Sequence, residues 1–284
     1  MTAFADVIGD PVAQSLSPAM QRFWIERLGL DARYEAVRVA GADIESFLAE
    51  RAARPDWRGC NVTMPHKQAV IPFLARLDPA ARRIGAVNTI VREEDGSLTG
   101  GNTDAEGFLQ PLRSELAKPH LFRMARIFGT GGAARAIVTA LAAEGLTIVL
   151  AGRTEEKART LLRKLGLEEG NYPVSLSHFR DPTDFAFDDR EGCLDLIVNA
   201  TSLGMEGKPA LPLHFSHIPP RSIVYDIVTH PVETPLLAEA AQRGLRRIDG
   251  LSMLIGQGAA AFARFFEVQP PRDDDAALRR MLAA

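Results

Sequence analysis

The sequence predicts an α/β protein of two domains, and three observations support this. Apolar, strand-like runs alternate with helical stretches along the chain, which is the pattern of sheets covered by helices. A glycine-rich turn, Gly129-Thr-Gly-Gly-Ala-Ala-Arg135, separates one of these strands from the helix that follows it. A length of 284 residues allows more than one core. We therefore expect one α/β domain before residue 104 and a second one after it.

The composition is that of an ordinary globular protein whose partners are small molecules. Hydrophobic residues make up 46% and charged residues 24% of the chain, and the formal net charge is −3. These values give no reason to expect nucleic-acid binding, and no apolar run is long enough to span a membrane. The two cysteines, Cys60 and Cys193, are too few for a disulfide framework or a cysteine-based zinc site. We expect a cytoplasmic monomer or homodimer that binds no metal.

The first domain is predicted from a β-α-β-α-β run. Strands are expected at residues 3–9, 33–39 and 57–63, and helices at residues 18–28 and 42–54. Ser17 is a natural N-cap for the first helix, and Pro18 suits its first position. A short helix that starts at Pro65 and a strand at 86–92 that turns at Asp95-Gly96 complete the expected domain.

The second domain is predicted from a stricter alternation of strand and helix. Strands are expected at residues 123–128, 147–151, 194–199, 222–227 and 245–248, and helices at 105–116, 133–144, 155–165, 236–243 and 251–266. Continuous apolar runs of this kind are typical of buried parallel strands. Residues 170–192 are expected to be irregular. The helix at 251–266 is long enough to return to the first domain.

The glycine turn has the spacing of a phosphate-binding loop. Gly129, Gly131 and Ala134 fit G-x-G-x-x-A, in which the first glycine allows a tight turn and the second lets the backbone approach a pyrophosphate. The phosphate would lie at a helix N-terminus, where free N–H groups favour an anion. The same turn can also serve only to pack a helix closely on a strand, so the motif alone leaves both interpretations open.

The end of the next strand indicates which dinucleotide binds. NAD sites usually have an acidic residue there, which receives the ribose 2′-hydroxyl. This chain has Arg153, Thr154 and, one helical turn later, Lys157, which suit a 2′-phosphate. The pattern predicts NADP as the cofactor. The alternative is an ordinary helix N-cap with solvated basic residues.

Two further groups of polar residues lie in the first domain. Ser15 and Ser17 stand at the start of a helix, where they can hold a carboxylate or simply cap the helix. Lys67, one of few lysines in the chain, follows a buried strand, and Asp104 lies where the two expected domains meet. Such a pair can hold a hydroxyl and share its proton during hydride transfer. The alternative is a solvated Lys67 and an Asp104 that only caps a helix.

An ordered set of motifs covers nearly the whole chain, and with it the sequence resembles the shikimate dehydrogenase family. The motifs are Ser15-Leu-Ser-Pro18, Asn61-Val-Thr-Met-Pro-His-Lys67, Gly85-Ala-Val-Asn-Thr89, Asn102-Thr-Asp104, Gly129-Thr-Gly-Gly-Ala-Ala134, Gly152-Arg-Thr154, Asn199-Ala-Thr-Ser202 and Asp249-Gly-Leu-Ser-Met253. The order and spacing of these motifs are more specific than any one of them.

The resemblance implies an enzyme that uses NADP to reduce 3-dehydroshikimate reversibly to shikimate, in the biosynthesis of chorismate and the aromatic amino acids. It implies a substrate-binding and catalytic domain at residues 1–104, completed by residues 251–284, and a Rossmann-type NADP-binding domain at 105–250. Thr229 stands where many members carry a tyrosine that faces the substrate. Dehydrogenases of quinate or aminoshikimate therefore remain alternatives. A non-catalytic relative that binds NADP is another, because a fold does not by itself fix function.

The resemblance also implies a role for each matching position. Lys67 and Asp104 would form the catalytic pair, and Ser15 and Ser17 would hold the substrate carboxylate. The ring hydroxyls would be held by Asn61, Thr63, Asn88 and Gln257. The cofactor would be held by Gly129, Gly131, Gly132, Ala133, Arg153, Thr154 and Lys157, and its nicotinamide half would lie near Thr201, Ser202, Ile227, Gly250 and Met253.

Overall fold

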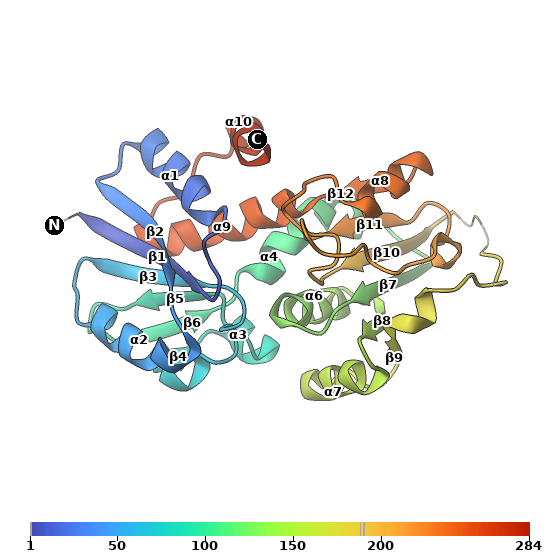
Figure 1. Ribbon diagram of the computed structural model, residues 1–284, viewed down its shortest axis with the longest axis horizontal. Coiled ribbons are helices and arrows are strands. Elements are labelled where there is room, and N and C mark those ends of the chain that lie inside the picture. The colour runs from blue at the N-terminus through green and yellow to red at the C-terminus, as the bar shows by residue number, and fades with distance from the viewer. Residues whose placement is uncertain (1, 188, 190) are drawn as a thin grey trace. The chain divides into compact units, whose positions relative to one another are not determined.

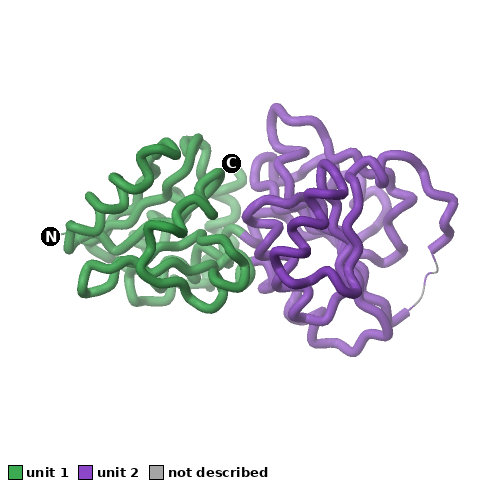
Figure 2. Tube along the Cα trace, turned by 90° about the horizontal axis from the view of Figure 1, so that it is seen from below, with its two compact units in different colours: residues 1–107, 254–284 green, residues 108–253 purple. Residues whose placement is uncertain are grey.

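The computed structural model describes residues 2–187, 189 and 191–284, and the chain divides into two compact units (Figure 2). Unit 1 consists of residues 1–107 and 254–284, and unit 2 consists of residues 108–253. The sequence predicts that the chain passes between domains near residues 104 and 250. Each unit has its own six-stranded sheet (Figure 1).

The sheet of unit 1 is mixed and has the strand order β2-β1-β3-β5-β6-β4. Its strands are β1 (Ala3–Gly9), β2 (Ala32–Arg38), β3 (Trp57–Val62), β4 (Arg76–Leu77), β5 (Thr89–Arg92) and β6 (Leu98–Gly101). Strands β2 and β3 pair parallel with β1, whereas β5 pairs antiparallel with β3 and with β6. The parallel half follows from the predicted β-α-β-α-β run, and the antiparallel half is the hairpin that turns near Gly96.

Helices cover both faces of this sheet. The helical segments of unit 1 are α1 (Ser17–Leu28), η1 (Gly41–Asp43), α2 (Ile44–Ala52), η2 (Ile71–Phe73), α3 (Pro79–Ile84), the start of α4 (Asp104–Leu109), most of α9 (Gly250–Phe266) and α10 (Asp275–Ala283). On one face, Ile44 and Leu48 of α2 pack on the strands. On the other face, the ring of Trp24 in α1 packs against the ring of Phe262 in α9, with 5.7 Å between the ring centroids. The expected return of the last helices to the first domain is confirmed.

Unit 2 is a doubly wound parallel sheet with the strand order β12-β11-β10-β7-β8-β9 (Figure 1). Its strands are β7 (Phe122–Phe128), β8 (Thr147–Gly152), β9 (Tyr172–Ser175), β10 (Cys193–Asn199), β11 (Ile223–Asp226) and β12 (Arg246–Ile248). Its helical segments are η3 (Gln110–Leu112), α5 (Arg113–Leu116), α6 (Gly132–Ala143), α7 (Glu155–Leu165), η4 (Leu176–Phe179), η5 (Phe215–His217) and α8 (Pro235–Gln242). The chain order reverses between β7 and β10, as in dinucleotide-binding folds.

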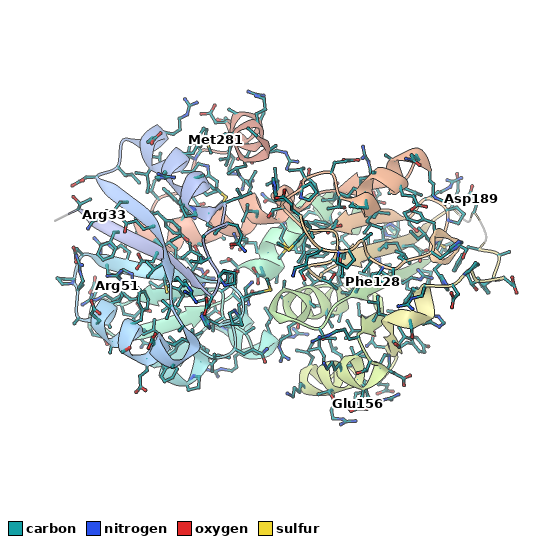
Figure 3. All side chains as sticks on the ribbon, in the orientation of Figure 1. Arg33, Arg51, Phe128, Glu156, Asp189 and Met281 are labelled. Atoms are coloured by element: carbon teal, nitrogen blue, oxygen red, sulfur yellow. The ribbon has the colours of Figure 1, made fainter. Side chains whose placement is uncertain are left out.

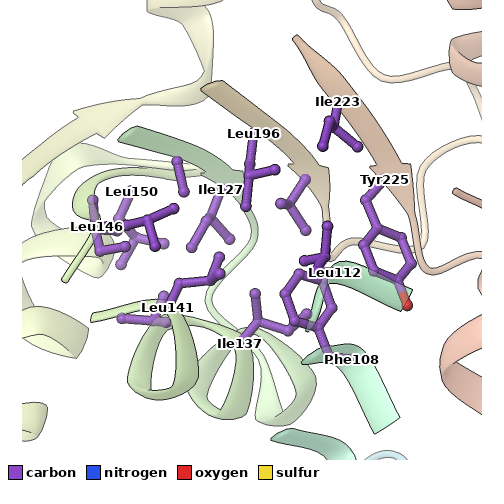
Figure 4. Close-up of a cluster of buried hydrophobic side chains, with 14 of the residues drawn as sticks. Phe108, Leu112, Ile127, Ile137, Leu141, Leu146, Leu150, Leu196, Ile223 and Tyr225 are labelled. Atoms are coloured by element: carbon purple, nitrogen blue, oxygen red, sulfur yellow. The ribbon is translucent and has the colours of Figure 1, made fainter. Parts of the chain in front are cut away.

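Apolar clusters fill both faces of the unit 2 sheet. Figure 4 shows the larger cluster, in which Ile127 and Leu196 of the strands face Ile137 and Leu141 of α6. On the opposite face, Phe128 of β7 packs edge-on against Phe179, with 4.9 Å between the ring centroids. Phe128 is labelled in Figure 3. Because helices and loops bury the central strands from both sides, most of their buried residues are apolar.

The structure corrects several expectations about single elements. Ser17 is the first helical residue of α1 rather than its N-cap, because Leu16 occupies the cap position and makes no side-chain cap hydrogen bond. The segment after Pro65 forms turns and the short η2, and no α-helix. Residues 170–192 are not wholly irregular, since they include β9 and η4; residues 188 and 190 of this stretch lie outside the described residues. Helices α3 and α10 were not predicted.

Two negative findings hold for the described part of the chain. None of its helices is long and apolar enough to cross a membrane. Its His, Cys, Asp and Glu side chains form no group of three or more that could hold a metal ion.

Candidate active site

The loop that follows β3 is held by backbone hydrogen bonds on both sides. The Thr63 amide donates to the Ile8 carbonyl (2.9 Å), and the Val87 amide donates to the Lys67 carbonyl (2.7 Å). The His66 ring lies 2.7 Å from the Val39 carbonyl oxygen and is buried. These contacts fix the backbone at Lys67 relative to β1 and to the segments that follow β2 and precede β5. His66 thus has a structural role in holding this loop.

Gly9, at the end of β1, allows this loop to lie against the sheet. A Cβ atom at Gly9 would lie 2.5 Å from Cγ2 of Thr63 and 2.9 Å from the Met64 carbonyl oxygen. Carbon atoms in proteins do not approach so closely, so any side chain here would displace the loop that carries Lys67.

We expect Gly9→Ala to lower both stability and turnover. Overpacking of this kind typically costs about 1–3 kcal/mol, and a shifted loop moves Lys67 from its partner. Urea unfolding and steady-state turnover measure the two effects. Gly41→Ala is the matched control, because a Cβ at Gly41 has no atom within 4 Å. If Gly9→Ala and Gly41→Ala behave alike, the close approach has no role.

Lys67 and Asp104 form a sheltered ion pair inside unit 1. Nζ of Lys67 lies 2.5 Å from Oδ2 of Asp104, and the two side chains are 15% and 5% exposed. Asp104 is the first residue of α4, and its amide donates to Oδ1 of Asn102 (3.0 Å). Lys67 is therefore not a freely solvated surface lysine. An ammonium group held by a carboxylate can give a proton to a developing alkoxide and take it back in the reverse reaction.

Asn88 lies at the centre of the polar residues around this pair. Its Nδ2 donates to Oδ1 of Asp104 (2.8 Å) and Oγ1 of Thr103 (2.9 Å), and lies 3.4 Å from Oε1 of Gln257. Asn61 is also buried, and its Nδ2 donates to the Asn88 carbonyl (3.1 Å). Unit 1 therefore brings together five residues that the sequence analysis singled out: Asn61, Lys67, Asn88, Asp104 and Gln257.

Ser15 precedes α1, Ser17 is its first residue, and Thr63 directly follows β3. Oγ of Ser15 accepts from the Ser17 amide (3.3 Å), while Ser17 is 8% exposed. Thr63 is half-buried, and its methyl group lies against Gly9. No interaction between the serines and Lys67 is found among the described residues.

The glycine turn of unit 2 has the geometry that its sequence predicts. Gly129 follows β7 with φ 117°, and a Cβ there would lie 2.7 Å from the Ala200 carbonyl oxygen. Gly131 is the N-cap of α6, where a Cβ would have no atom within 4 Å. Gly132 and Ala133 form the first turn of α6, and Ala134 is fully buried. The close approach is thus made by the first glycine, and open space lies beside the second, as a bound phosphate needs.

The residues expected to hold a 2′-phosphate lie at the end of β8 and the start of α7. Thr154 is the N-cap of α7, and its side chain accepts from the Lys157 amide. Arg153 and Lys157 are exposed and pair with no acidic side chain in the part of the chain that is described. Arg159, by contrast, pairs with Glu155. Two cations therefore remain available beside the N-terminus of α7.

The remaining candidate cofactor residues follow β10, β11 and β12. Oγ1 of Thr201 donates to Oδ1 of Asn199 (2.7 Å), and Ser202 follows it in the same turn. A Cβ at Gly250 would lie 2.6 Å from the Ile227 carbonyl oxygen, so only glycine fits there. Met253 is 6% exposed and packs in the larger apolar cluster. These positions share the carboxyl edge of the sheet, where ligands of doubly wound folds bind.

Sequence reasoning missed some polar residues that support the pair in unit 1. Thr89 and Thr103 are buried beside Asn88, and Tyr34 is buried beside Asn61. The two threonines belong to the motifs Gly85-Ala-Val-Asn-Thr89 and Asn102-Thr-Asp104, but the sequence analysis gave neither of them a role. Tyr34 lies in β2, far from any motif, and carries no local signal.

The described units define a class: an α/β protein with a dinucleotide-binding unit and a second unit that carries a lysine–carboxylate pair. A model of the shikimate dehydrogenase substrate binding domain matches residues 7–90, and one of the shikimate 5′-dehydrogenase C-terminal domain matches residues 250–276. Shikimate dehydrogenase (NADP(+)) from Sphingopyxis alaskensis is 45% identical over 99% of this chain and 97% of its own length. The enzyme of that name from Paramagnetospirillum magneticum is 42% identical over 95% of each chain.

A solved structure agrees with these sequence relatives. Shikimate 5-dehydrogenase from Thermus thermophilus, in complex with NADP(H) and shikimate, has a TM-score of 0.83 and 36% identity, with 99% of each chain covered. The chain therefore belongs to the shikimate dehydrogenase family.

Proposed function

We propose that this protein is an NADP-dependent oxidoreductase that reversibly reduces 3-dehydroshikimate to shikimate, a step toward chorismate and the aromatic amino acids. The observation that carries the proposal is the sheltered pair of Lys67 and Asp104, in a chain whose curated relatives are named shikimate dehydrogenase (NADP(+)). With two free cysteines, one of them buried, we also propose a cytoplasmic location.

The residues present in unit 2 fit NADP. The open space beside Gly131 at the N-terminus of α6 suits a pyrophosphate. Arg153, Thr154 and Lys157 would hold the 2′-phosphate, and Arg153 can also stack on the adenine. Thr201, Ser202, Ile227, Gly250 and Met253 would line the nicotinamide half. When bound, the cofactor supplies or accepts the hydride.

The side chains of unit 1 would bind the substrate and transfer the proton. Ser15 and Ser17 would hold the substrate carboxylate at the start of α1, and Thr63 and Gln257 would hold ring hydroxyls together with Asn61 and Asn88. Lys67 would give its proton to the oxygen on the carbon that receives hydride, and Asp104 would hold the ammonium in place. In the direction of oxidation, the neutral amine of Lys67 would take the proton.

The expected result of an absorbance assay is rapid reduction of NADP by shikimate. Quinate in place of shikimate, and NAD in place of NADP, should each give a lower kcat/KM. Measurement of NADPH at its absorbance band with all four combinations tests the proposal. Faster turnover of quinate would assign the chain to a related dehydrogenase. Thr229 makes this outcome worth testing, because it replaces the tyrosine that faces the substrate in many members of the family. No turnover of shikimate, quinate or aminoshikimate would favour a non-catalytic NADP-binding protein.

A further inference from the structure

A line of buried hydrogen bonds joins Tyr34 of β2 to the lysine–carboxylate pair. The Tyr34 hydroxyl donates to Oδ1 of Asn61 (2.6 Å), and Nδ2 of Asn61 donates to Oγ1 of Thr89 (3.1 Å). The Thr89 hydroxyl donates to Oδ1 of Asn88 (2.9 Å), and Nδ2 of Asn88 donates to Oδ1 of Asp104 (2.8 Å). All five residues belong to unit 1, and each is at most 6% exposed.

Every donor in this line points toward Asp104. Each group accepts from the residue before it and donates to the residue after it, so the hydrogen bonds polarise one another in the same sense. The line ends on the carboxylate, whose other oxygen receives the Lys67 ammonium. The line therefore holds the Asp104 carboxylate in the orientation in which it meets Lys67.

The amide hydrogens of the two asparagines are already engaged within the protein. Nδ2 of Asn61 donates to Thr89 and to the Asn88 carbonyl, and Nδ2 of Asn88 donates to Thr103 and Asp104. An amide nitrogen has two hydrogens, so neither side chain retains an N–H for another acceptor. Without a substrate, these N–H groups therefore support Asp104 and its neighbours, and a ring hydroxyl would bind the asparagines only in place of one of these contacts.

Tyr34 begins the line and is held there by its surroundings. Its side chain is 2% exposed, and its ring lies 6.4 Å from the ring of Phe265 in α9. Burial raises the pKa of its hydroxyl well above the usual range, with a smaller effect from Cys60 and Asp6. The hydroxyl thus stays protonated and remains a donor to Asn61.

We propose that Tyr34 is a positioning residue for the reaction, which acts on Asp104 and Lys67 through Asn61, Thr89 and Asn88. Without the Tyr34 hydroxyl, Oδ1 of Asn61 becomes a buried acceptor with no donor, which is costly. The Asn61 side chain then shifts toward another partner, and its bonds to Thr89 and Asn88 weaken. This proposal rests on the proposed function, because its main measure is turnover of shikimate.

The test begins with Tyr34→Phe, which removes one hydroxyl and keeps the ring. We expect kcat for shikimate to fall about 3- to 10-fold, the size that one neutral hydrogen bond supports. KM for NADP should stay within about twofold of the wild-type value, because the candidate cofactor residues lie in unit 2. Thr99→Val is the matched control, because its hydroxyl is buried in the same unit and has no hydrogen-bond partner among the described residues. It should leave kcat unchanged.

A double-mutant cycle with Thr89→Val separates positioning from a general loss of stability. Thr89→Val cuts the line, so adding Tyr34→Phe should lower kcat no further, whereas independent effects would multiply. Thermal unfolding of each variant shows the stability change separately. If Tyr34→Phe does not fold, Thr89→Val alone should still lower kcat 3- to 10-fold at constant KM for NADP.

The outcomes distinguish this proposal from the proposed function. Wild-type protein that does not turn over shikimate overturns the function itself. Active wild-type protein with unchanged kcat in Tyr34→Phe, or with multiplying effects in the double variant, overturns the role of Tyr34.

Discussion

Lys67→Ala should lower kcat for shikimate by about 10²- to 10⁴-fold, which is the usual contribution of general acid–base catalysis. The variant lacks the proton donor, and it leaves the carboxylate of Asp104, 5% exposed, without its ammonium partner. Affinity for NADP should be nearly unchanged, because the glycine turn and Arg153 lie in unit 2. Stopped assays at high enzyme concentration give kcat, and fluorescence titration gives the NADP affinity.

Two companion variants sharpen this result. Lys67→Arg keeps the positive charge but cannot release a proton near neutral pH, so it should also be slow. Lys118→Ala removes a lysine whose side chain is 60% exposed and pairs with Glu115, and it should keep full activity. Thermal unfolding of all three shows whether the loss at Lys67 is chemical. Full turnover by Lys67→Ala would exclude this residue as the proton donor.

Arg153→Asp should turn cofactor preference from NADP toward NAD. The variant removes one charge-assisted contact to the 2′-phosphate, a contact worth about 1.5–3 kcal/mol, so KM for NADP should rise about 10- to 150-fold. The new carboxylate can accept from a ribose 2′-hydroxyl, so NAD should lose little or gain. The ratio of kcat/KM for the two cofactors measures the change.

The matched control for Arg153→Asp lies on α7, the helix that follows Arg153. Arg163→Asp makes an equal change of charge on α7, at a side chain that is 59% exposed and pairs with Glu168. It should leave the cofactor ratio unchanged. An unaltered ratio in Arg153→Asp would mean that the basic residues at the start of α7 only face solvent.

Much of the fold was predictable because its signals are local. The strand at Ala3–Gly9 and the helix at Glu155–Leu165 have the bounds that their sequences predict. In each case the sequence also marks where the element begins and ends. For α7, Thr154 is the N-cap and Gly166 is the C-cap. Strand β9, by contrast, has only four residues and includes Pro173, so it has no distinct period and was missed.

The candidate site was predictable only in part. The motifs placed Lys67, Asn88 and Asp104 in the same family signature, but nothing in their spacing gives the distance between them. They meet because the loop after β3, the start of β5 and the start of α4 converge in unit 1. The assignment of substrate and cofactor contacts to particular side chains stays a prediction, which the variants above test.

The sequence by itself determined the α/β class, the two-unit organisation and the glycine turn at Gly129, because these depend on periodicity and on backbone conformations of neighbouring residues. Only the tertiary structure decided that Lys67 is paired rather than solvated, that Gly9 must lack a side chain, and that hydrogen bonds connect Tyr34 to Asp104. Such contacts join residues far apart in the chain, and their geometry depends on how strands and loops pack. The residues next to each of these positions in the sequence therefore do not predict the contacts.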